Sequence, residues 1–169
     1  DTTAAAGGAN TAANAAAVAL APLSSLCTLT LGDVYCDLGA MLQEHLRWDD
    51  AEKVYREGIV AVPGHASLFF NLGVLLKNGP RKDFNGAIEA FTSAVKADPT
   101  IAVALRNLGA LMLDKKMDTT AAEVYYRRSL QLDPDNHRGQ EGLKRVLAAQ
   151  KVRRQHSREQ TERCDSPLL

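Results

Sequence analysis

The chain repeats nearly the same seven-residue phrase three times at close to equal intervals. It reads D-L-G-A-M-L-Q at 37–43, N-L-G-V-L-L-K at 71–77 and N-L-G-A-L-M-L at 107–113. The phrases start 34 and 36 residues apart. A period in this range is typical of stacked supersecondary units, each too small to bury its own apolar face. The repeat therefore argues against a single closed core.

Each phrase opens a longer series in which large and small residues recur in one order. After the Leu-Gly pair come a small residue, an aromatic residue, a second small residue and a proline. These are Ala51, Tyr55, Gly58 and Pro63 in the first unit, Ala87, Phe91, Ala94 and Pro99 in the second, and Ala122, Tyr126, Ser129 and Pro134 in the third. Leu38, Leu42 and Leu46 recur every four residues, which predicts a helical stripe, and Gly39 lets a second helix approach closely. Each unit is predicted to be a hairpin of two helices.

This order resembles the tetratricopeptide repeat, a 34-residue helical hairpin with a Leu-Gly pair, an alanine, an aromatic residue and a proline at fixed offsets. The resemblance covers about residues 32–136 and implies an all-α fold, an α-solenoid of tetratricopeptide hairpins in a right-handed superhelical stack. The three repeats would span residues 32–65, 66–101 and 102–136.

Local signals place the helix ends. We expect Asp49 and Asp50 to cap the second helix of the first unit, and Thr120 with Glu123 to form a capping box in the third unit. Asp98-Pro99 and Asp133-Pro134 are predicted to stop one helix and start another. We read residues 1–31 as an Ala-rich low-complexity segment that is helical in part. Residues 137–158 are predicted to form a capping helix with a basic extension, and 159–169 a flexible tail.

Several classes of function lack support in the sequence. Lys plus Arg equals Asp plus Glu at 20 each, so nucleic-acid binding is not expected, although the basic excess gathers after residue 137. Three cysteines without a CxxC pair predict neither zinc nor disulfides and favour the cytoplasm or another reducing intracellular compartment. No transmembrane segment is expected.

Catalysis is not expected either, and no cofactor or metal is predicted. The four histidines are scattered, and the chain has no HExxH frame, GxSxG elbow or phosphate-binding glycine loop. The D-P-D-N run at 133–136 lacks the bidentate glutamate of a calcium loop and is interpreted as a turn with a helix cap. The basic residues Lys151, Arg153 and Arg154 are interpreted as a solvated helix face.

The remaining candidate site is a groove. In tetratricopeptide solenoids the first helix of each hairpin lines a concave surface, so the resemblance implies that this surface captures an extended segment or helix of a partner protein. The side chains predicted to line it share one helical face in each unit. They are Asp33 and Asp37 with Cys36 and Ala40 in the first unit, Ser67, Phe70, Asn71 and Val74 in the second, and Val103, Arg106, Asn107 and Ala110 in the third.

Two subfamilies give sharper expectations. Domains that clamp the tails of Hsp70 and Hsp90 carry Lys and Asn where this chain has Asp33 and Asp37, Asn at the position of Asn71, and Lys and Arg where it has Val103 and Asn107. Only Asn71 fits this pattern, so binding of those tails is not expected. The superhelix of O-GlcNAc transferase carries a ladder of inner asparagines, and Asp37, Asn71 and Asn107 occupy the corresponding position in successive units, so that the first rung here is acidic. Asn71 and Asn107 can instead serve only to bond neighbouring turns.

Three hypotheses therefore stand. The chain is a non-catalytic interaction scaffold or adaptor, the substrate-selecting region of a larger enzyme such as a glycosyltransferase, or a structural subunit of a multiprotein complex. Because it begins at Asp1 without a methionine, we expect a processed product or an excised fragment.

Overall fold

The computed structural model describes residues 31–164, and within this range the chain is helical with no strand. A first helix includes residues 31–44. It is followed by α2 (Trp48–Ala61), α3 (Ala66–Asn78), α4 (Phe84–Ala97), α5 (Ala102–Asp114), α6 (Thr119–Leu132) and α7 (His137–Cys164). The seven helices expected from the sequence are therefore confirmed in the described residues. Expectations for residues 1–30 and 165–169 lie outside them.

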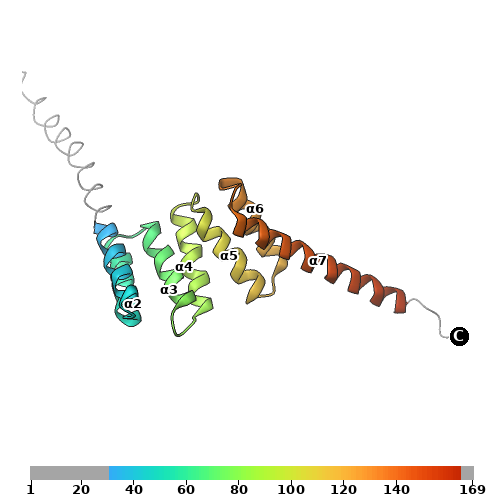
Figure 1. The fold of residues 1–169 in the computed structure, drawn as a ribbon, viewed down its shortest axis with the longest axis horizontal. Helices are drawn as coiled ribbons and strands as arrows, with labels where there is room; N and C mark the ends of the chain where they lie inside the picture. The colour runs from blue at the N-terminus through green and yellow to red at the C-terminus, as the bar shows by residue number, and fades with distance from the viewer. Residues whose placement is uncertain (1–30, 165–169) are drawn as a thin grey trace, which may run out of the picture.

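The helices stand side by side in an elongated row rather than around one centre (Figure 1). The two helices of each hairpin pack on each other, α3 on α4 and α5 on α6, and neighbouring hairpins meet through α2 with α3 and α4 with α5. This arrangement follows from the repeat, because each hairpin buries its apolar face mainly against its neighbours.

A glycine beneath an aromatic ring brings the two helices of each hairpin together. A Cβ atom added to Gly73 would lie 2.8 Å from Phe91 Cδ1, and one added to Gly109 would lie 3.0 Å from Tyr126 Cδ2. Gly39 stands in the same way beneath Tyr55. The prediction that the Leu-Gly pairs lie at the hairpin interface is confirmed at these glycines.

The leucine of each Leu-Gly pair shows the stacking between hairpins. Leu72 is 5% exposed and Leu108 is 1% exposed, whereas Leu38 in the first unit is 43% exposed. Leu31, Val34 and Met41, which share the helical face of Leu38, are exposed as well. In units two and three the preceding hairpin covers this face; among the described residues, no hairpin precedes the first unit.

The predicted stripe through Leu38, Leu42 and Leu46 is wrong at its last member. The helix ends at residue 44, and Leu46 lies in the following turn with φ 60° and its side chain largely exposed. Only three residues separate this helix from α2, so the chain must turn sharply there, and the left-handed conformation of Leu46 is part of that turn.

Two predicted helix caps are also wrong. The N-cap of α6 is Asp118, whose carboxylate accepts hydrogen bonds from the backbone N–H groups of Thr120 and Ala121. Thr120 therefore lies inside the helix. A carboxylate suits the N-cap position because the positive end of the helix dipole stabilises its negative charge. Helix α2 begins after Arg47 without a side-chain cap, and Asp49 and Asp50 occupy its first turn instead.

The turns at Asp98-Pro99 and Asp133-Pro134 do end α4 and α6, which confirms the prediction for these segments. Helix α7 then runs 28 residues to Cys164, beyond the predicted end of the capping helix at 158. Arg, Gln and Glu dominate this stretch and have high helix propensity, which favours a continued helix even without an apolar face. Its far half projects beyond the stack (Figure 1).

Candidate functional site

The residues predicted to line the groove lie on the first helix of each hairpin: residues 31–44, α3 and α5. We call their solvent-facing side the inner face. Its members differ in exposure. Asp33, Asp37, Ala40, Ser67 and Val103 are exposed; Phe70, Asn71, Val74, Arg106 and Ala110 are half-buried; Cys36 and Asn107 are buried.

Asn71 bonds to the preceding unit. Its side chain forms a hydrogen bond with the Cys36 thiol, which is buried between the first helix and α3. Burial raises the pKa of Cys36 to about 11; the bond from Asn71 opposes the rise, and the charges of Asp33 and Asp37 add to it. The thiol therefore stays protonated at neutral pH and acts as a packing residue rather than a nucleophile.

Asn107 makes the corresponding bond one unit further along. Its Oδ1 accepts a hydrogen bond of 2.9 Å from the Lys77 ammonium on α3, and the asparagine itself is only 8% exposed. Burial lowers the pKa of Lys77, and the positive charges of Arg106 and Arg138 lower it further. The bond satisfies a buried amide oxygen and fixes the position of the lysine without neutralising it.

Arg106 continues this pattern toward α7. Its Nη1 donates to Asn136 Oδ1 at 3.4 Å, and the same oxygen accepts the backbone N–H of Gly139 in the first turn of α7. Asn136 Nδ2 donates in turn to Asp133 Oδ2. The D-P-D-N run therefore serves as a turn and helix cap, as predicted.

The opposite end of the inner face is acidic. Asp33 Oδ1 lies 3.4 Å from His65 Nε2, and the two form an ion pair when the imidazole is protonated. The Asp33 side chain remains 69% exposed. Asp37 is exposed on the same helix. From residue 31 to residue 44 the helix contains no lysine or arginine. Charge on the inner face therefore changes from negative at the first unit to positive at α5 and α7.

The predicted residues do not form one cluster. They bond in separate pairs between successive units, and three residues that the sequence analysis missed take part in or lie beside these pairs. These are Lys77 and Asn136, which bond to Asn107 and Arg106, and Arg138, whose charge helps to lower the pKa of Lys77. Lys77 follows Val74 by three residues, so helical spacing could have placed it on the same face. The roles of Asn136 and Arg138 depend on how α7 sits against α5, which no short-range pattern gives.

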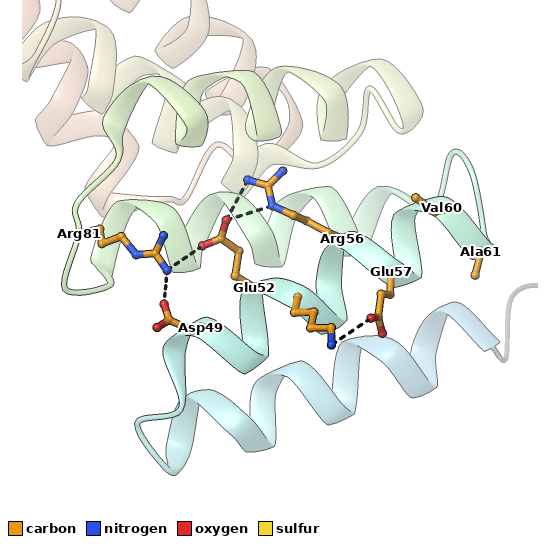
Figure 2. Close-up of a pocket in the computed structure, with 8 residues that line it drawn as sticks. Asp49, Glu52, Arg56, Glu57, Val60, Ala61 and Arg81 are labelled. Carbon is orange, nitrogen blue, oxygen red and sulfur yellow. Dashed lines mark hydrogen bonds and ion pairs between the residues drawn. The ribbon is translucent and has the colours of Figure 1, made fainter.

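A hollow of about 600 Å³ lies elsewhere, along the outer side of α2 (Figure 2). Arg81 pairs with Asp49 and Glu52, Arg56 pairs with Glu52, and Lys53 lies 3.9 Å from Glu57. Since these charges neutralise one another and do not converge on a common point, the hollow offers no evident polar anchor for a ligand.

Two further observations concern the part of the chain that the structure describes. None of its helices has both the length and the apolar character needed to cross a membrane. No cluster of three or more His, Cys, Asp or Glu side chains there could hold a metal ion.

The arrangement is similar to several solved structures. The first TPR domain of Spaghetti (RPAP3), bound to the HSP90 peptide SRMEEVD, matches with a TM-score of 0.66 and 22% identity over 72% of this chain and 94% of that one. The second TPR domain of human RPAP3, in complex with the HSP70 peptide SGPTIEEVD, matches with a TM-score of 0.63 and 18% identity, over 71% and 98%. An O-GlcNAc transferase of Thermobaculum terrenum matches with a TM-score of 0.60 and 21% identity, over 71% of this chain and 22% of that one.

Among curated proteins, the protein O-mannosyl-transferase Tmtc3 of Drosophila melanogaster is 28% identical over 118 residues. That match covers 70% of this chain and 12% of the fly protein, so the chain spans about an eighth of its relative's length. No protein-family profile matches the chain.

A row of helical hairpins, each stacked on the next, makes this protein an α-solenoid. Its fold is that of the tetratricopeptide-repeat domains, with three repeats followed by a capping helix.

Proposed function

We propose that the chain is a non-catalytic protein-interaction module that binds an extended segment or a helix of a partner protein on its inner face. The observation that carries this proposal is the set of bonds linking successive units, Asn71 to Cys36, Asn107 to Lys77 and Arg106 to Asn136. They hold inner side chains of successive repeats in fixed positions before any partner arrives. Such preorganisation reduces the entropy lost on binding.

Peptide binding by similar folds supports the proposal, since two of the matched TPR domains were solved with peptides. Those peptides come from HSP90 and HSP70, so the comparisons give no support to the expectation that this chain does not bind chaperone tails. We do not carry that expectation forward.

The chain's own residues support a narrower prediction, which concerns only the terminal carboxylate of such a tail. Where the clamp subfamily carries Lys and Asn in the first unit and Lys and Arg in the third, this chain has Asp33 and Asp37, and Val103 and Asn107. We expect no grip on a terminal carboxylate, so a free SRMEEVD peptide and its C-terminally amidated form should bind equally in a fluorescence titration. Binding that is lost on amidation would show that the terminal carboxylate is gripped.

The test of the proposed function uses exposed positions. Asn71→Ala and Asn107→Ala are poor choices because both side chains already bond within the fold. Val103→Glu places a bulky charge on the inner face, where Val103 is 37% exposed, without removing an internal bond. Val60→Glu is the matched control on the outer side of α2, where Val60 is 80% exposed.

We expect a partner that copurifies with the native chain, identified by mass spectrometry, to be recovered with the Val60 variant and lost with the Val103 variant, both variants keeping the melting temperature of the native chain. Equal recovery with both would show that the partner does not use the inner face.

A second function is favoured by one observation, the similarity to a transferase over a short part of its length. On this alternative the repeats select substrates for a catalytic domain elsewhere in the same polypeptide. The mass of the native protein distinguishes the two, because a transferase requires a further domain of several hundred residues. The third hypothesis, a structural subunit, predicts that the chain fractionates only within a large complex.

A further inference from the structure

Three cations from α3, α5 and α7 lie close together at one end of the inner face. Lys77 on α3 bonds to Asn107 on α5, and Arg106 adjoins Asn107 in the sequence. Arg106 in turn reaches Asn136, two residues before Arg138 at the start of α7. These contacts put Lys77, Arg106 and Arg138 in one row, which we call the cationic row.

The row keeps its charge because its internal partners are neutral. Among the described residues none of the three cations forms an ion pair with a carboxylate, and Lys77 and Arg106 are instead held by amide oxygens. Asp133 accepts a hydrogen bond from the amide nitrogen of Asn136.

Several cations elsewhere in the stack are paired with carboxylates, although Lys116 also bonds to an amide oxygen, that of Asn85. Arg56 pairs with Glu52, Arg127 with Glu123 and Arg145 with Asp114. In the cationic row Lys77 and Arg106 are half-buried and Arg138 is exposed. Neighbouring like charges of which two are half-buried are costly for the free protein, and the row becomes favourable when an anion reaches it.

We propose, on the basis of the proposed function, that the cationic row binds a run of Asp and Glu side chains in the partner's segment. The segment would lie with its acidic part over α5 and the start of α7. Any basic part would lie toward Asp33 and Asp37 at the other end of the inner face. The row thus supplies both an affinity for acidic sequences and a direction of binding.

The acidic end of the same face favours a protein segment over a nucleic acid strand. A strand carries negative charge along its whole length, so Asp33 and Asp37 would repel it. A strand is also usually held by aromatic rings that stack on its bases. Phe70, the aromatic residue of the inner face, is half-buried and packs against Phe91 with ring centres 5.8 Å apart.

The experiment is a fluorescence-anisotropy titration of the full chain with a labelled, C-terminally amidated octaglutamate peptide, with octaglutamine as its uncharged match. We expect octaglutamate to bind and octaglutamine not to. Binding should weaken as salt rises from about 50 to about 500 mM, because screening shortens the reach of the charges. Each of Lys77→Gln, Arg106→Gln and Arg138→Gln should weaken binding by about threefold to tenfold.

Matched controls remove positive charges of the same kind from α2 and α6, away from the inner face. Lys53→Gln corresponds to Lys77→Gln, and Arg127→Gln corresponds to the two arginine variants. A third control, Arg153→Gln with Arg154→Gln, removes the exposed charges of the projecting half of α7. The controls should bind octaglutamate as the native chain does. Melting temperatures of all variants establish that the fold is retained.

Three results would overturn the proposal. They are equal binding of the two peptides, unchanged octaglutamate binding when Lys77, Arg106 and Arg138 are all replaced by Gln, or loss of binding only with the Arg153→Gln, Arg154→Gln control. Tighter binding of a single-stranded oligonucleotide would reassign the row to nucleic acid. The proposed function is judged separately by Val103→Glu. A native partner lost with that variant, while octaglutamate fails to bind, would leave the proposed function standing and refute the acidic preference.

Discussion

The leucines of the three Leu-Gly pairs allow one substitution to be compared in three environments. Leu38, Leu72 and Leu108 occupy the same position of their repeats, and they differ in whether a preceding hairpin covers them. Their exposures are 43%, 5% and 1% respectively. Replacing each in turn by alanine therefore removes the same atoms from one exposed and two buried sites.

The expected magnitudes follow from burial. In a close-packed interior, Leu→Ala costs about 2–5 kcal/mol, because the transfer free energy is lost and a cavity remains. Leu72→Ala and Leu108→Ala should fall near the middle of that range, at about 3 kcal/mol. Leu38 is about half removed from water and its loss leaves no closed cavity, so Leu38→Ala should cost about 1 kcal/mol.

The measurement is urea unfolding of the full chain followed by far-ultraviolet circular dichroism, with the free energy of unfolding taken from the midpoint and slope. A repeat array can lose cooperativity when a middle unit is weakened, so the slope must be compared between variants before the free energies are. A cost for Leu38→Ala equal to that for Leu72→Ala would refute the reasoning, since it would mean that the exposed face of the first helix is covered in solution.

Three further predictions test other features. Gly73→Leu and Gly109→Leu should each cost about 1–3 kcal/mol, because the new side chain meets the ring of Phe91 or Tyr126; unchanged thermal melting in both variants would contradict the contact. Asp118→Ala should cost about 1 kcal/mol through loss of the α6 cap, whereas Thr120→Ala should have less effect; the reverse order in thermal melting would restore the capping box. Because the pKa of Cys36 is raised to about 11 by burial, its alkylation should be slow in the native chain at any pH well below that value and should accelerate in urea. Peptide-resolved mass spectrometry measures it, and equal rates in the two conditions would contradict the burial.

The repeat made the fold predictable, because its period and its small-large order report packing that is local to each hairpin. The Leu-Gly pairs placed Gly73 and Gly109 at the hairpin contacts without any knowledge of the tertiary structure. Failures occurred where two signals competed. Asp118 and Thr120 are both good caps, and the sequence does not say which begins the helix.

The candidate site was less predictable, since its polar residues act between units. Helical spacing placed Asn71 and Asn107 on the inner face, but it could not indicate that Asn107 is buried beneath Lys77. Arg138 lies 32 residues after Arg106 in the sequence and joins it only because α7 packs against α5. Contacts between side chains this far apart in the sequence can be identified only from the packed structure.

The contact of each glycine with an aromatic ring also bears on how such a sequence can diverge. Gly39 with Tyr55, Gly73 with Phe91 and Gly109 with Tyr126 each share one fixed volume between two helices. A larger residue in place of the glycine is tolerated only if the ring becomes smaller in the same lineage, and the first of two such changes is harmful on its own. Descendants should therefore change at both positions or at neither, so that a hairpin retains its pair long after its surface has become unrecognisable.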